Sequence, residues 1–387
     1  MHMDPALPMV VMFALITLSL GLLMKLLKQP TIVAYILAGI LLGPHVLGWV
    51  TDQVLITRMG EFGVVMLLFF IGMEVVPEKL MASWKVSILG TLAQIILSVI
   101  LIAAVGYYYQ WSFSRILLVG FIISLSSTAV VLNLFQQSKE IETQTGQTVL
   151  GILLTQDLFV VLMIITLGFF STEPSSTSQI IGQIIGAIVM VGFAAFIIAK
   201  KSLHLPWAKY LKTDHDLQVF AALLSCFGFA LLSSYFNLST ALGAFLGGML
   251  IGRAKETRWV HSSLEPFRVV FVALFFMSLG LMVNIDFIQQ NLYVVLLVAL
   301  LVLFSNLLIN AGIIMAANRS WKQSLYAGSV LAPVGEFSFV LAAIGFQIHA
   351  LTDYGYQLII AVIVLTLLIS PLLIGFAKKW LMEQSKH

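Results

Sequence analysis

Long apolar runs separated by short polar, charged or turn-forming clusters recur along the whole chain. Each run is about 20 residues long, which suffices for a helix to cross a hydrocarbon core of about 30 Å. We therefore predict an all-α membrane protein with many spans. Thirteen transmembrane helices are expected at 6–27, 31–49, 58–76, 84–109, 113–136, 145–170, 177–200, 216–236, 238–253, 264–284, 291–317, 322–348 and 356–380.

Composition supports a polytopic membrane protein. Hydrophobic residues make up 60% of the 387 positions and charged residues only 10%, against roughly 25% charged residues in a typical soluble domain. The first apolar run has no small-residue cleavage site after it, so it is expected to remain as a helix. The single cysteine, Cys226, excludes an intramolecular disulfide and any cysteine-based metal site.

The positive charges predict an orientation. With the N-terminus outside, 18 of the 20 Lys and Arg residues fall in loops or a tail on the cytoplasmic side, and only Arg58 and Arg115 fall on the other side. Cytoplasmic loops collect Lys and Arg. The asymmetry therefore favours thirteen helices in an inner (plasma) membrane, with the N-terminus outside and the C-terminus in the cytoplasm.

Three motifs occur twice in the same order, which indicates an internal duplication. "AYILAGILLGP" resembles "GAFLGGMLIGR", "VVMLLFFIGMEV" resembles "VFVALFFMSLGLMV", and the polar break "ISLSSTAVV" pairs with "LAPVGEFSFV". The displacement is about 206 to 209 residues each time. It equals seven predicted helices, an odd number, so the repeats are inverted, an arrangement found in secondary transporters. We expect a first repeat at 1–170, a linker helix and cytoplasmic loop at 171–213, and a second repeat at 214–387.

Only two carboxylates lie near the centre of a predicted span, Asp157 and Glu336. A charged group at that depth costs several kcal/mol unless it is compensated, so such residues are candidates for a functional site. Gln156 precedes the aspartate directly, and both side chains, with Glu336, are expected to bind a cation. Either carboxyl could instead be a structural partner in helix packing, and that alternative stays open.

Hydroxyl groups and irregular backbone are expected beside these carboxylates. The span at 113–136 contains Ser124, Ser126, Ser127 and Thr128, whose oxygens suit a hard monovalent cation. In the span at 322–348, Pro333 and Gly335 precede the glutamate, and proline frees a backbone carbonyl. Irregular backbone is tolerated at this depth only where protein buries it or it lines a cavity. We therefore predict two broken helices that cross near Asp157.

This constellation predicts antiport. Burial disfavours the charged form of a carboxyl group, so the group holds a proton in the absence of a cation and releases it when a cation binds. The proton and the cation then compete for one site that opens to each side in turn. No Lys or Arg lies near the midpoint of any predicted span. One carboxylate cycling alone predicts one-for-one, electroneutral exchange.

The motifs "SLSSTAVVLNL" (124–134), "LLTQDLFVV" (153–161) and "GEFSFVL" (335–341) resemble the monovalent cation:proton antiporter-2 family, specifically its Kef-type potassium/proton antiporters. "VAYILAGILLGPHVLG" and "EFGVVMLLFFIGMEV" agree with the early helices of that family. The resemblance implies the sodium/proton-antiporter fold, a homodimer and transported K⁺ and H⁺ without a cofactor. The Gln156–Asp157 pair, where many sodium exchangers of this fold have Asp–Asp or Asn–Asp, implies potassium.

Two departures from Kef-type proteins concern regulation. Those proteins usually continue into a soluble nucleotide-binding domain, whereas this sequence ends at His387 and contains no G-x-G-x-x-G after a strand. We therefore expect no soluble regulatory domain; a separate regulatory subunit stays open as a partner, beside membrane lipid. The loop at 255–268 is less acidic than in glutathione-gated members, which argues against such gating.

Several alternatives remain at this stage. The same fold could exchange sodium for protons, and a pathway lined by hydroxyls and carbonyls could conduct cations passively. A symporter or sensor on the same scaffold is a third interpretation, disfavoured because no central basic residue would hold an anion. Nothing in the sequence indicates an enzyme or nucleic-acid binding.

Overall fold

The structure is a computed structural model that describes residues 6–27, 29, 31–74, 85–128, 130–131, 134–135, 140, 143–170, 177–200, 214–236, 238, 240–253, 258–317 and 319–381. In these ranges the regular elements are helices, and β-type pairing is limited to one antiparallel bridge between Ser126 and Val334. The chain forms two compact units, Met1–Thr51 with Glu78–Thr172 and Leu279–His387, and Asp52–Pro77 with Glu173–Ser278.

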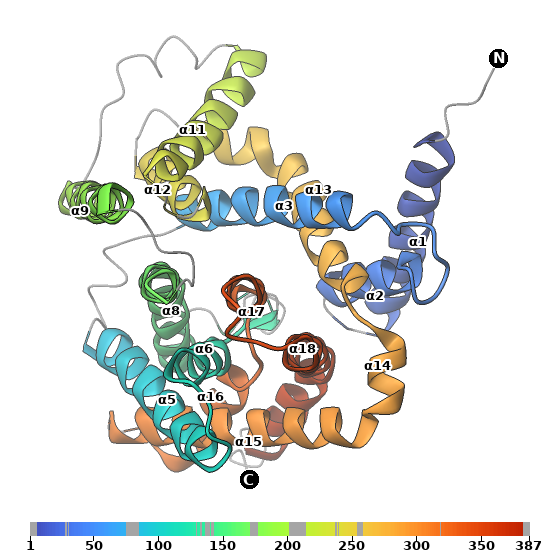
Figure 1. Cartoon of the computed structure of the whole chain (residues 1–387), viewed down its shortest axis with the longest axis vertical. Coiled ribbons are helices and arrows are strands. Elements are labelled where there is room, and N and C mark those ends of the chain that lie inside the picture. The colour runs from blue at the N-terminus through green and yellow to red at the C-terminus, as the bar shows by residue number, and fades with distance from the viewer. Residues whose placement is uncertain are drawn as a thin grey trace. The chain divides into compact units, whose positions relative to one another are not determined.

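The first unit contains the interrupted helices and the candidate carboxylates. Its described elements are α1 (Ala6–Leu26), α2 (Thr31–Leu42), the π-helical turn η1 (Lys85–Leu89), α5 (Gly90–Tyr108), α6 (Phe113–Ser124), α8 (Gln144–Gly168), α14 (Ile285–Gln290), α15 (Leu292–Ala316), α16 (Trp321–Leu331), α17 (Phe337–Gln347) and α18 (Asp353–Leu381). α15 packs along α16, α5 packs along α6, and α17 contacts α6, α8 and α18. Figure 1 shows α17 and α18 nearly end-on, with α15 running across the view.

The second unit consists of α3 (Gln53–Glu74), α9 (Thr177–Ala199), α11 (His215–Tyr235), α12 (Thr240–Arg253) and most of α13 (Arg258–Leu281). α12 packs between α3 and α11. A Cβ atom on Gly248 would overlap the carbonyl oxygen of Phe69, so α12 and α3 touch backbone to backbone. Met66, Phe69 and Cys226 are buried in the core of this unit.

Polar residues set the starts of several helices. The side chains of Ser112, Thr143, Asp214, Asn284 and Ser320 each accept a hydrogen bond from the backbone N–H three residues later. These bonds satisfy donors that have no partner inside the first turn. The short polar clusters used to separate the predicted spans therefore mark real helix ends.

Six described helices are long and apolar enough to cross a membrane by length and composition, and further predicted spans correspond to shorter apolar helices. The continuous helix predicted at 31–49 is wrong beyond Leu42, because Gly43 and Pro44 follow and proline cannot donate a helical hydrogen bond. The spans at 113–136 and 322–348 are interrupted, as the polar motifs predict. Residues 201–213 of the expected linker lie outside the described residues. The count of thirteen stays a prediction.

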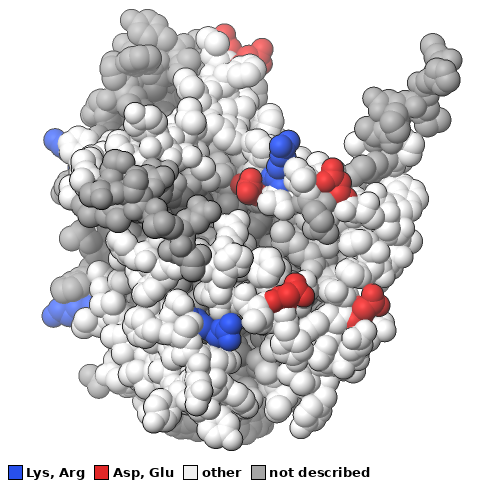
Figure 2. Space-filling view, in the orientation of Figure 1, with Lys and Arg blue, Asp and Glu red and all other residues white. Residues whose placement is uncertain are grey.

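One face of the described part is largely uncharged. Lys, Arg, Asp and Glu form small separate groups on the face shown in Figure 2. Large apolar side chains such as Leu300, Leu301 and Phe304 on α15 are more than half exposed. An apolar exterior of this kind is stable against lipid tails, because their polarity matches that of leucine.

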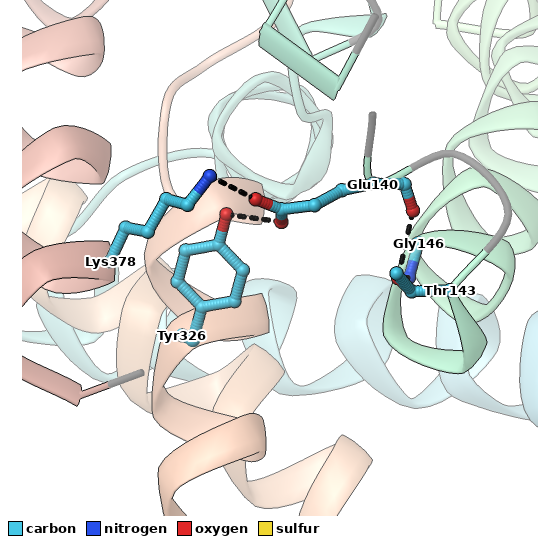
Figure 3. A network of polar contacts seen from close by, with 5 residues as sticks. All are labelled: Glu140, Thr143, Gly146, Tyr326 and Lys378. Atoms are coloured by element: carbon cyan, nitrogen blue, oxygen red, sulfur yellow. Dashed lines mark hydrogen bonds and ion pairs between the residues drawn. The ribbon is translucent and has the colours of Figure 1, made fainter. Parts of the chain in front are cut away.

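A polar cluster ties the start of α8 to α16 and α18 (Figure 3). The hydroxyl of Tyr326 donates to Oε2 of Glu140 at 2.6 Å, and Lys378 forms an ion pair with the other carboxylate oxygen. The backbone carbonyl of Glu140 accepts a hydrogen bond from the hydroxyl of Thr143, which caps α8. One residue, Glu140, therefore connects three elements of the first unit, α16 and α18 through its carboxylate and α8 through its backbone carbonyl.

We expect Glu140→Leu to destabilise the protein more than Lys378→Met. The Tyr326 hydroxyl is buried, and leaving it unpaired costs about 1–3 kcal/mol, whereas an ion pair to a half-exposed lysine contributes about 1 kcal/mol or less. Thermal unfolding in detergent measures both variants. Adding Tyr326→Phe to Glu140→Leu should recover part of the loss. Equal loss in both single variants would contradict this ranking.

Candidate cation site at two interrupted helices

The first interruption lies directly after α6. Leu125 has an extended conformation, with φ −88° and ψ 130°, and the Ser124 hydroxyl donates back to the Phe121 carbonyl at 2.8 Å. Helical hydrogen bonding resumes where the Val131 N–H donates to the Ser127 carbonyl at 3.3 Å. Serine side chains compete with the backbone for hydrogen bonds. A serine-rich stretch therefore interrupts a helix whose flanks are apolar.

The second interruption separates α16, which ends at Leu331, from α17, which begins at Phe337. Pro333 has no N–H to donate, so the helix cannot continue through it. A Cβ atom on Gly335 would lie 2.5 Å from the carbonyl oxygen of Ser126. Glycine is therefore required at this position for the two interrupted chains to approach each other.

The two interruptions bind each other through the backbone. The Ser127 N–H donates to the Pro333 carbonyl at 3.1 Å, and the Gly335 N–H donates to the Leu125 carbonyl at 2.9 Å. These bonds flank the single antiparallel bridge of the described chain. Polar backbone that is buried must be hydrogen-bonded, and here each extended segment supplies the partners of the other.

Both candidate carboxylates contact the first interruption. The Thr128 hydroxyl lies 3.1 and 3.3 Å from the two carboxylate oxygens of Asp157 on α8. The Ser127 hydroxyl donates to Oε2 of Glu336 at 3.1 Å. The two acids are 5% and 1% exposed. Adjacent hydroxyls thus bind acids that lie far apart in the sequence, one on α8 and one at the start of α17.

Gln156 is bonded to the interruption rather than free. Its Oε1 accepts from the Ser126 N–H at 3.0 Å, and its Nε2 donates to Oε1 of Gln94 at 2.7 Å. The same Nε2 lies 3.3 Å from both the Ser124 carbonyl oxygen and the Ser126 hydroxyl. The Ser126 hydroxyl in turn donates to the Leu331 carbonyl at 2.6 Å. In this arrangement Gln156 supports the interrupted backbone.

The sequence-predicted residues form one connected polar cluster in the first unit. Its members are Ser124, Ser126, Ser127, Thr128, Gln156, Asp157, Pro333, Gly335 and Glu336. Sequence reasoning missed Gln94 on α5 and Asn306 on α15, both fully buried and both bonded to the interruptions. The available signal was an uncharged amide in the middle of an apolar span.

The described buried residues around the cluster carry no positive charge. Among the buried side chains that the structure describes, none is Lys, Arg or His. The described residues also contain no group of three His, Cys, Asp or Glu side chains that could hold a metal ion. The Asp157 carboxylate therefore has a neutral hydroxyl, that of Thr128, as its hydrogen-bond partner, and a carboxylate in such a place binds either a proton or a mobile cation.

Comparisons with known proteins agree on a family. The family described as sodium/hydrogen exchanger, transmembrane, matches residues 11–380. The iron transporter MagA of Paramagnetospirillum magneticum is 35% identical over 95% of this chain and 84% of its own length. The K(+) efflux antiporter 5 of Arabidopsis thaliana is 30% identical over 91% of this chain, which spans 63% of that protein.

A solved structure shares the fold. The sodium proton antiporter MjNhaP1 from Methanocaldococcus jannaschii aligns with a TM-score of 0.68 over 96% of this chain and 97% of its own, at 18% identity. The all-helical architecture is thus that of MjNhaP1, although little of the sequence is shared.

Proposed function

The chain belongs to the transmembrane sodium/hydrogen exchanger family, and from that premise we propose that it exchanges a monovalent cation for a proton, with Asp157 as the carrier. The family consists of transporters, so no enzymatic activity is assigned. One observation carries the proposal: Asp157 is buried, and both of its carboxylate oxygens lie within hydrogen-bond distance of the neutral Thr128 hydroxyl.

The exchange cycle follows from charge. A buried carboxylate without a positive partner is costly, so the group binds either a proton or a cation. When a dehydrated cation enters, the proton leaves to the same side, and Asp157 stays neutralised in both states. The loaded site then opens to the opposite side, where the reverse exchange occurs. Since neither loaded state changes the net charge of the site, the exchange is one-for-one and electroneutral.

We propose potassium as the preferred cation. The Gln156–Asp157 pair resembles the Kef-type motif, and one relative is named a K(+) efflux antiporter. Sodium is the second candidate, because the family and the solved neighbour are named for sodium. Iron is the third candidate cation, and it is included only because one relative is named iron transporter MagA. The described residues offer no cluster of three metal-binding side chains for it.

Several wider assignments belong to the same proposal. We place the protein in the inner membrane with thirteen spans, the N-terminus outside, the C-terminus in the cytoplasm, and a homodimer as the working form. Inverted repeats at 1–170 and 214–387 are supported by Ser127 and Glu336, which bond to each other and lie 209 positions apart in the sequence. That separation agrees with the displacement of the repeated motifs.

Transport by the purified protein in proteoliposomes tests the proposal. Vesicles with an acidic interior and a trapped pH dye receive K⁺, Na⁺, Fe²⁺ or an impermeant cation outside, with and without valinomycin. We expect K⁺ to drive proton exit, saturably and without sensitivity to membrane voltage. Because the ions compete, lowering the external pH should raise the apparent KM for K⁺ and leave the maximal rate unchanged.

Each other outcome has a defined meaning. If Na⁺ drives proton exit and K⁺ does not, the exchange mechanism is retained and the assignment of potassium selectivity is wrong. Voltage-dependent proton exit contradicts one-for-one exchange. Potassium flux that neither saturates nor moves protons identifies a passive channel and overturns the proposal, and Fe²⁺ flux alone favours a transporter of the kind that the name MagA describes.

A further inference from the structure

The carbonyls at the end of α6 are all occupied. The last four carbonyls of a helix have no partner inside it. Here the Phe121 carbonyl accepts from the Ser124 hydroxyl at 2.8 Å and the Ile122 carbonyl from the Ser338 hydroxyl at 2.7 Å. The Ile123 carbonyl accepts from Nδ2 of Asn306 at 2.7 Å. The carbonyl of Ser124 itself accepts from Nε2 of Gln94 at 2.8 Å and is 3.3 Å from Gln156.

Asn306 binds both interrupted chains through one nitrogen. Besides the Ile123 carbonyl, its Nδ2 donates to the carbonyl of Ala332, which follows α16, at 3.1 Å. An amide nitrogen carries two hydrogens, so the two bonds use its full donor capacity. The residue is fully buried on α15. A single side chain therefore fixes the end of α6 relative to the end of α16.

Gln94 fixes the same region from α5. Its Nε2 holds the Ser124 carbonyl, and its Oε1 accepts from Nε2 of Gln156. This second bond orients the Gln156 amide so that its oxygen accepts from the Ser126 N–H. Gln156 directly precedes Asp157 on α8, and Ser126 lies two residues before Thr128.

We propose that Gln94 and Asn306 are positioning residues of the cation site, which together form an amide clamp on the ends of α6 and α16. The inference rests on the proposed function, because it assigns the clamp to the site of Asp157. Helix C-termini carry partial negative charge, and the clamp satisfies it with neutral donors. It thereby holds the Ser127 and Thr128 hydroxyls against their acids without placing a competing positive charge in the site.

The chain supplies matched controls for both residues. Asn310 is a fully buried amide one turn further along α15, and its Nδ2 donates to the Asn306 carbonyl of the same helix, not to an interruption. Ser98 is buried one turn from Gln94 on α5, and its hydroxyl has no hydrogen-bond partner among the described residues. Asn306→Leu is thus compared with Asn310→Leu, and Gln94→Leu with Ser98→Ala.

Two measurements on full-length protein separate positioning from simple stability. The first is the apparent KM and maximal rate for K⁺ in proteoliposomes. The second is the K⁺ concentration that half-saturates thermal stabilisation in detergent, which requires no transport. For Asn306→Leu and Gln94→Leu we expect both concentrations to rise roughly tenfold, about 1.4 kcal/mol of binding free energy. The controls should keep wild-type values, even where Asn310→Leu lowers the thermal midpoint.

The result that overturns the clamp is wild-type K⁺ concentrations in both clamp variants, or equal shifts in each variant and its control. A second pair of variants keeps the test decisive if the leucine variants do not fold. Asn306→Gln and Gln94→Asn retain an amide and should recover part of the K⁺ affinity. If the wild-type protein does not exchange protons, the proposed function fails. The clamp is then still tested by the K⁺ concentration that half-saturates thermal stabilisation, because that measurement requires no transport. Absence of any stabilisation of the wild type by either K⁺ or Na⁺ overturns both.

Discussion

Asp157→Asn is expected to abolish proton-coupled cation flux, with a loss of at least about a hundredfold. Removing one charge of a buried pair costs about 3–5 kcal/mol, which is more than a hundredfold in affinity, and the amide cannot carry the proton. The fold should persist, because asparagine has nearly the same shape and its oxygen can still accept from the Thr128 hydroxyl. Dye-monitored flux and thermal unfolding measure the two effects.

The control makes the same chemical change elsewhere. Glu140→Gln also converts a carboxylate to an amide, but in the cluster with Tyr326 and Lys378 rather than at the interruptions (Figure 3). We expect nearly normal flux from it. Normal flux in Asp157→Asn would mean that this aspartate is structural. The carrier would then be sought at Glu336, with Glu336→Gln as the deciding variant.

Much of this site could be predicted from composition and motif order. Asp157 stands out because it is the one ionisable side chain between Gly146 and Phe170, and Pro333 with Gly335 marks a backbone that cannot stay helical. The interruptions themselves follow from local chemistry. The family resemblance is confirmed, since the sodium/hydrogen exchanger family matches residues 11–380 and a potassium efflux antiporter is among the relatives.

The partners of the interruptions could not be predicted, because they depend on packing between distant helices. Nothing local distinguishes Asn306, which reaches both interruptions, from Asn310, which bonds back to its own helix. Gln156 was expected among the cation ligands beside Asp157; its atoms are bonded to Gln94 and to the interrupted backbone, and a role in binding the ion stays a prediction. A sequence shows which polar groups are buried but not which groups they meet.

The boundaries of the two compact units also could not be predicted from the sequence. The duplication predicts two consecutive halves, whereas the compact units draw residues from both halves of the chain. Sequence repeats reflect the duplication from which a chain arose, whereas compact units reflect which helices pack against each other. The two divisions therefore describe different properties, and the repeat boundaries at 170 and 214 remain predictions.

Gly335→Ala is expected to reduce transport nearly as strongly as loss of the carrier. The added Cβ would lie 2.5 Å from the Ser126 carbonyl oxygen and 2.9 Å from its carbon. These are backbone atoms held by the bonds between the two interruptions, so they cannot rotate aside as a flexible side chain would. Overpacking in a well-packed interior costs about 1–3 kcal/mol or more. The displacement falls on Ser127 and Glu336, and hence on the site itself.

Gly312→Ala is the matched control for this variant. Gly312 lies within α15, and among the described residues no atom beyond its own helix backbone lies within 4 Å of a Cβ placed there. Alanine is favoured over glycine inside a helix by about 0.5–1 kcal/mol, so this variant should keep full flux and gain slightly in thermal stability. If Gly335→Ala also kept full flux, the interruptions would have to be free to separate by several tenths of an ångström. The contacts of Asp157 and Glu336 with the Thr128 and Ser127 hydroxyls would then not depend on the close approach of Gly335 to Ser126.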